Sequence, residues 1–91
     1  MTGLRMVLAE DDVLLREGLA SLLEHSGFEV VGQAGDSAEL LRLVGEEAPA
    51  LVVVDIRMPP THTAEGLEAA RQIRRDHPRT GILVLSAHVE V

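Results

Sequence analysis

Cysteine, tryptophan and tyrosine are absent from the 91-residue sequence, and phenylalanine occurs once. Without cysteine, the chain has no disulfide framework, no thiolate nucleophile and no zinc–thiolate site. The shortage of aromatic rings removes the stacking platforms with which proteins bind single-stranded nucleic acid. Basic residues are also scarce, since eight Lys and Arg against 15 Asp and Glu give a net charge of −7. Such an acidic chain is not expected to hold DNA or RNA by itself, because phosphate contacts need a basic face.

Long hydrophobic runs are missing as well. No segment reaches the roughly 20 apolar residues that a membrane span needs. The first six residues lack a basic region followed by a long apolar stretch. We therefore expect a cytoplasmic protein without membrane contact. The hydrophobic content of 46% is ample for a core, and the length allows one domain.

Short apolar segments alternate with amphipathic ones along the chain. The apolar segments predict strands, and apolar positions three and four residues apart predict helices between them. Asp36 with Glu39 resembles a capping box, and Gly27 is placed to end the first helix. The order β-α-β-α-β-α-β predicts an α/β fold, a doubly wound parallel sheet with helices on both faces. Strands are predicted at residues 4–9, 28–31 (closed by Gly32), 51–55 and 82–85. The apolar stripe of the first helix is Leu15, Leu19, Leu22 and Leu23, and that of the second is Leu40, Leu41 and Val44. The third helix, about 65–77, carries Leu67, Ala70 and Ile73.

The segment 51–60 organises the rest of the chain. Four aliphatic residues, three of them valines, run directly into Asp55, and prolines bound the run on both sides. A continuous apolar run of this kind is typical of a strand buried on both faces. Asp55 is then expected at the carboxyl end of a central parallel strand, where open α/β sheets bind their ligands. This segment alone leaves open the alternative that Asp55 only turns the chain.

Acidic and hydroxyl side chains follow two other predicted strands. Glu10, Asp11 and Asp12 follow the first strand, and Ser86 follows the fourth. Taken alone, the acidic residues also suit the positive end of a helix dipole. Gathered with Asp55 at one edge of the sheet, however, the carboxylates would repel one another. Mg²⁺ would relieve this repulsion and complete its shell with phosphate oxygens, and a carboxylate beside it is a candidate nucleophile toward phosphorus.

With these features, the chain resembles the receiver domain of two-component response regulators. The resemblance rests on the acidic residues after the first strand, on Asp-x-x-Met-Pro beginning at Asp55, and on Ser86 at the position of the family's switch residue. Residues 14–19 resemble the first helix of regulators with a LuxR-type DNA-binding domain. The resemblance implies a flavodoxin-like fold with strand order 2-1-3-4-5. It also implies that a histidine kinase transfers a phosphoryl group to the chain, with Mg²⁺ as cofactor.

The resemblance assigns roles residue by residue. Asp55 is the phosphorylated residue and a metal ligand. Glu10 and Asp11 correspond to the family's acidic pair, Asp11 binding Mg²⁺ directly and Glu10 acting mainly through water. Asp12 is then the residue after the pair and less suited to be a ligand. Arg57 lends its backbone carbonyl to the metal, and Ser86 would hydrogen-bond a phosphoryl oxygen.

The sequence departs from the family pattern in two places. The loop after Pro59 is longer than usual, so Thr61, His62 and Thr63 have no family role. The sequence also stops before the family's fifth strand and following helix, its catalytic lysine and any output domain. We therefore expect a receiver domain over residues 1–91 that is incomplete at its C-terminus. DNA binding would need the missing output domain, and an exposed strand at 82–85 would favour a homodimer.

Two other classes of function fit part of the pattern. An aspartate-based phosphohydrolase also uses a strand-end Asp with Mg²⁺, but it carries a second acid where this chain has Arg57. A receiver-like module that binds proteins without being phosphorylated remains open. The expected function is a phospho-accepting signalling domain rather than an enzyme. The four histidines show no ligand spacing, and Arg71, Arg74 and Arg75 are expected on a solvated helix face.

Overall fold

Parallel strands and intervening helices make up the part of the chain that the computed structural model describes, residues 3–59 and 64–85. The strands form one sheet in the order β2-β1-β3-β4. This confirms the predicted flavodoxin-like α/β fold and the first four positions of its strand order. The strands are β1 (Arg5–Ala9), β2 (Glu29–Ala34), β3 (Leu51–Asp55) and β4 (Gly81–Leu85), and the helices are α1 (Val13–His25), α2 (Ser37–Glu47) and α3 (Glu65–Asp76).

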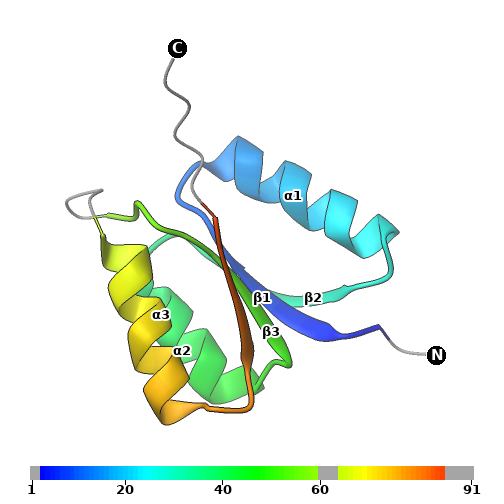
Figure 1. Ribbon diagram of the computed structural model, residues 1–91. Coiled ribbons are helices and arrows are strands. Elements are labelled where there is room, and N and C mark those ends of the chain that lie inside the picture. Colours follow the sequence, from blue (N-terminus) through cyan, green and yellow to red (C-terminus); the bar gives the residue numbers. More distant parts are fainter. Residues whose placement is uncertain (1–2, 60–63, 86–91) are drawn as a thin grey trace.

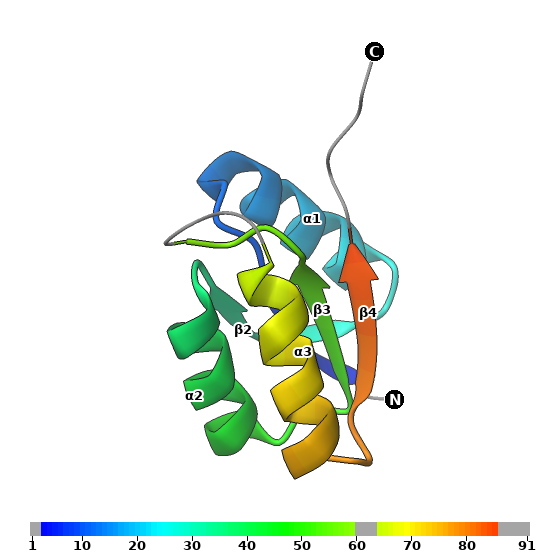
Figure 2. The ribbon, with the colours of Figure 1, turned by 60° about the vertical axis from the view of Figure 1, so that its left-hand side comes forward.

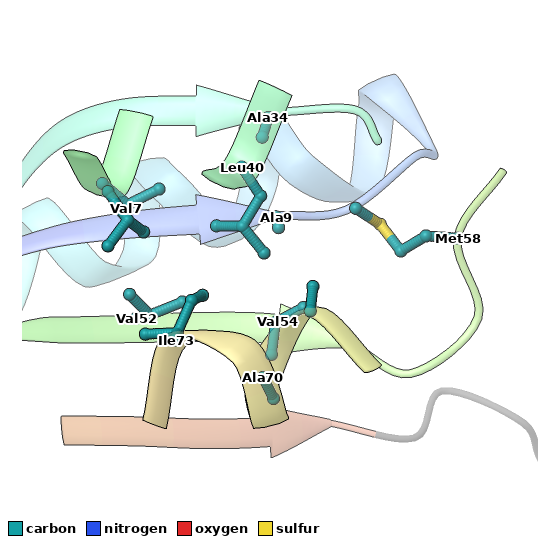
Figure 3. Close-up of a cluster of buried hydrophobic side chains, with 11 residues drawn as sticks. Val7, Ala9, Ala34, Leu40, Val52, Val54, Met58, Ala70 and Ile73 are labelled. Atoms are coloured by element: carbon teal, nitrogen blue, oxygen red, sulfur yellow. The ribbon is translucent and has the colours of Figure 1, made fainter. Parts of the chain in front are cut away.

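The sheet separates two hydrophobic clusters. Helix α1 packs on one face, and α2 and α3 pack on the other (Figures 1 and 2). Because side chains alternate along a strand, β1 contributes to both clusters, and so do the valines of β3, which explains the continuous apolar run in its sequence. The larger cluster (Figure 3) comprises Val7, Ala9, Ala34, Leu40, Val44, Val52, Val54, Met58, Ala69, Ala70 and Ile73, and the smaller cluster comprises Met6, Leu8, Ala20 and Val53.

Capping interactions fix the ends of two helices. The Asp36 Oδ1 atom accepts the N–H of Glu39 at 2.8 Å, and the Glu39 carboxylate accepts the N–H of Gly35 at 3.0 Å. The predicted capping box therefore forms, with its return bond one residue before the N-cap. Gly27 follows α1 with a φ of 101°, a left-handed conformation that glycine adopts without strain.

The predicted end of the second strand was wrong. β2 continues through Gly32 to Ala34, and its register against β1 shifts between Met6 and Val7. A Cβ atom at position 32 would lie 3.1 Å from the Leu43 Cδ2 atom. Gly32 therefore allows α2 to pack closely on the strand instead of ending it.

The predicted apolar stripe of α1 is only partly directed at the sheet. Leu19 and Leu23 pack against the smaller cluster, together with the buried Ala20. Leu15 and Leu22 are 40% and 62% exposed. The periodicity therefore identified the helix correctly but assigned two exposed side chains to the core.

Candidate functional site

Three carboxylates meet at the carboxyl edge of the sheet. Glu10 and Asp11 follow β1, and Asp55 ends the neighbouring β3. One carboxylate oxygen from each residue lies within 4.8 Å of those from the other two. Glu10 is buried, whereas Asp11 and Asp55 are half-buried. The structure thus brings together the three carboxylates that the sequence placed at this edge.

The surroundings of Glu10 raise its pKa to about 8. The largest cause is burial, which disfavours the charged form, and the hydrogen bond and negative charge of Asp55 act in the same direction. The N–H of Asp11, which donates to Glu10 Oε2 at 3.0 Å, acts against them. A divalent cation would compete with this proton, because carboxylate ligands bind metals in their deprotonated form. The set of hard oxygen donors fits Mg²⁺.

The end of β3 is held in place by its neighbours. The N–H of Ile56 donates to the Leu85 carbonyl at 2.9 Å, and the N–H of Gly66 donates to the Ile56 carbonyl at 2.8 Å. A Cβ atom on Gly66 would overlap the Asp55 carbonyl oxygen, so glycine lets the start of α3 lie against the strand end. Met58 is buried in the larger cluster and points back toward it (Figure 3). Together these contacts fix the backbone that carries the Asp55 carboxylate.

Asp12 and Arg57 have different positions from the three carboxylates. Asp12 is the exposed N-cap of α1, and its Oδ1 atom accepts the N–H of Leu15 at 3.0 Å. The capping role is sufficient to explain why position 12 is acidic, and no metal-binding role is needed for it. Arg57 is exposed, and its N–H donates to Asp55 Oδ1 at 3.3 Å. The role of its carbonyl as a metal ligand stays a prediction.

A cavity of about 230 Å³ adjoins Glu10 and Asp55. Leucine side chains form much of its wall, which accounts for the poor solvation of the Glu10 carboxyl group. A larger depression of about 460 Å³, at the amino ends of β3 and β4, has no carboxylate among the described residues of its wall. The smaller cavity is lined by Leu8, Ala9, Glu10, Leu15, Leu19, Asp55 and Leu85.

Sequence reasoning missed two residues that support the site, Arg16 and Gly66. The Arg16 Nη1 atom donates to the backbone carbonyl of Glu10 at 2.8 Å. The sequence did hint at a role for Arg16, because a positively charged residue near the start of a helix is disfavoured by the helix dipole. Gly66 gave no signal, because its close approach to Asp55 depends on how α3 packs. Four residues considered from the sequence, Thr61, His62, Thr63 and Ser86, lie outside the described residues.

No helix within residues 3–59 and 64–85 combines the length and the apolar character required to span a bilayer.

The chain matches one known domain family and several known proteins. The sequence pattern of the response regulator receiver domain matches residues 6–91. Transcriptional regulatory protein PdtaR of Mycobacterium tuberculosis is 41% identical over 69 residues, which are 76% of this chain and 32% of PdtaR. A protein-glutamate methylesterase/protein-glutamine glutaminase of Haloarcula marismortui is 36% identical over 88 residues, 97% of this chain and 23% of that protein. The chain therefore spans a third or less of the length of these two relatives.

A solved structure extends the similarity to three dimensions. The crystal structure of a LuxR-family two-component response regulator from Aurantimonas sp. SI85-9A1 matches with a TM-score of 0.86 and 35% identity. The match covers 97% of this chain and 61% of that one. It confirms the resemblance to LuxR-type regulators that residues 14–19 indicated.

Proposed function

The chain belongs to the response regulator receiver domain family, and we propose that it accepts a phosphoryl group on Asp55 from a histidine kinase. The observation that carries this proposal is the meeting of Glu10, Asp11 and Asp55 within 4.8 Å at the carboxyl edge of the sheet. Phosphoryl transfer needs a nucleophile and a way to hold negative charge at one point. The three carboxylates offer both, as the nucleophile and as ligands of a divalent cation.

In the proposed reaction, an Asp55 carboxylate oxygen forms the new bond to phosphorus. The bond between phosphorus and the kinase histidine nitrogen breaks, and the nitrogen keeps the electron pair. The contacts of Ile56 and Gly66 support this role, because they fix the strand end that carries the nucleophile. Ser86 would donate a hydrogen bond to a phosphoryl oxygen.

The proposed metal ligands are the Asp11 and Asp55 carboxylates and the Arg57 backbone carbonyl, with Glu10 acting mainly through water. Mg²⁺ bound there would neutralise charge on the phosphoryl oxygens. The buried Glu10 supports a cation at this point, since its pKa of about 8 reflects first its burial and then the neighbouring Asp55, and a cation would offset both effects.

We further propose that residues 1–91 serve as the receiver part of a cytoplasmic transcription regulator and are not an enzyme. The DNA-binding output would lie in other residues, in line with the net charge of −7 in this segment. Support comes from the LuxR-family structure and from PdtaR, a transcriptional regulatory protein.

Intact-mass analysis tests the phosphorylated residue. Wild-type chain incubated with Mg²⁺ and excess acetyl phosphate should gain one phosphoryl group, and Asp55→Asn should gain none. Labelling is expected to be slow, because the chain contains no lysine to neutralise the developing charge. Asp12→Asn is the matched control, because asparagine preserves the N-cap, and it should label at the wild-type rate.

Equal labelling of wild type and Asp55→Asn would reject the assignment. A wild type that binds Mg²⁺ but never labels would favour the second candidate, a module that binds partner proteins without phosphorylation.

A further inference from the structure

Arg16 occupies an unusual place for a cation. It lies in the first turns of α1, where the helix dipole disfavours positive charge. Its side chain is half-buried and reaches the turn after β1, where Nη1 donates to the Glu10 backbone carbonyl at 2.8 Å. Within the described part of the chain, its Nε atom is buried without a hydrogen-bond partner. A buried donor of this kind is rare in native structures and calls for an explanation.

The bond from Arg16 reaches the peptide group that joins Glu10 and Asp11, two residues of the proposed metal site. The carbonyl of this group belongs to Glu10, and its N–H belongs to Asp11. The carbonyl accepts from Arg16, and the N–H donates to Glu10 Oε2 at 3.0 Å. Both polar edges of the peptide are therefore bonded, so its plane cannot rotate without breaking a hydrogen bond.

The turn after β2, which contains Gly35, limits where the Arg16 guanidinium can lie. A Cβ atom on Gly35 would come 3.0 Å from Arg16 Nη1. Gly35 itself is held by its N–H bond to the Glu39 carboxylate. The guanidinium thus lies between the turn after β1 and the turn after β2, against a position with no side chain.

We propose that Arg16 is a positioning residue for the acidic site, acting through the peptide between Glu10 and Asp11. Glu10, Asp11 and Asp55 each bring one carboxylate oxygen within 4.8 Å of the others, so the backbone that carries them has to be held in place if all three are to face one point. The Arg16 hydrogen bond keeps the Glu10 and Asp11 carboxylates facing Asp55 before a cation arrives. This inference rests on the proposed function, because it concerns the same metal site.

Calorimetric titration with magnesium chloride tests the proposal. Arg16→Met should raise the Mg²⁺ dissociation constant by about tenfold or more, as losses of residues that orient metal ligands commonly do. Arg42→Met is the matched control, because Arg42 lies on the exposed side of α2 and pairs with Glu46. Its dissociation constant should equal that of wild type. Arg16→Lys keeps a charge and a donor and should restore part of the affinity.

Gly35→Ala tests position without removing charge. The added methyl group would lie 3.0 Å from Arg16 Nη1 and push the guanidinium back by a few tenths of an ångström, so Mg²⁺ affinity should fall as in Arg16→Met, but by a smaller factor. Gly18→Ala is its control, since a Cβ atom at position 18 meets open space. In ¹H–¹⁵N spectra recorded without metal, the Asp11 amide resonance should move in Arg16→Met and in Gly35→Ala, while that of Val53 stays in place.

The outcomes separate this proposal from the function on which it rests. A folded Arg16→Met with wild-type Mg²⁺ affinity would overturn the role of Arg16 and leave the metal site intact. If Arg16→Met does not fold, wild-type Mg²⁺ affinity in both Gly35→Ala and Arg16→Lys would also overturn the role of Arg16. A wild-type chain that binds no Mg²⁺ would overturn the proposed metal site together with the role of Arg16.

Discussion

Glu10 shows how strongly the fold can change a single carboxyl group. Its side chain is 4% exposed and faces Asp55, and its pKa rises from 4.5 to about 8. Between these two values the folded chain holds a proton that the unfolded chain has lost. Stability without metal therefore falls as pH rises through this window, because ionising Glu10 costs free energy only in the folded state.

This pH dependence can be measured by urea unfolding in the presence of a chelator. The free energy of unfolding should decrease from about pH 5 to 8, by at most about 1.4 kcal/mol per pH unit. Glu10→Gln should flatten the decrease, because glutamine does not ionise. Glu46→Gln, a change at an exposed position of α2, should leave it unaltered. A wild-type slope in Glu10→Gln would assign the effect to another group.

At the scale of elements, β4 is an edge strand in which no residue is fully buried. Among the described strands it pairs with β3 alone and stands at the end of the strand order. Its residues are aliphatic apart from Gly81, and Leu83 is 52% exposed. An edge without lysine or proline offers free N–H and C=O groups to another strand.

A preparation of the 91-residue chain is therefore expected to self-associate through β4. Leu83→Lys should favour the monomer, since lysine on an edge strand opposes pairing. Leu14→Lys, at an exposed position of α1, is the control and should associate like wild type. Light scattering over a dilution series measures the effect, and a stable wild-type monomer at all concentrations would contradict the prediction.

For the whole molecule, the proposed metal site would couple cation binding to folding. Mg²⁺ that binds only the folded chain stabilises it by about 2.7 kcal/mol at 100 times the dissociation constant. Thermal melts should therefore shift upward with added Mg²⁺. Asp11→Asn should reduce this shift more than Asp12→Asn, because Asp12 is engaged as the N-cap of α1. If Asp12→Asn reduced the shift more than Asp11→Asn, the acidic pair would have to be reassigned one residue further along the chain.

Prediction from the sequence was most accurate for features that depend on neighbouring residues in the chain. Alternating apolar segments identified the strands and helices, and the end of a buried strand identified Asp55. Prediction failed where contacts between elements decide, as at Gly32, whose role depends on Leu43 of α2. The raised pKa of Glu10 could not be predicted, because it depends on how deeply the fold buries Glu10 beside Asp55. The bond from Arg16 to the Glu10 carbonyl could not be predicted either, because it depends on how α1 packs beside the end of β1.

The unequal covering of the two faces of the sheet has a consequence for how the molecule opens. Helices α2 and α3 share the larger cluster, whereas Ala20 is the buried residue of α1. The α1 face is therefore expected to open as a separate cooperative unit, in a sub-global transition that leaves the other face folded. Arg16 and the Asp12 cap leave the sheet with α1. A cation bound to Glu10, Asp11 and Asp55 would hold the turn before α1 against the end of β3 and slow this transition, so that the lifetime of the closed form would depend on the metal.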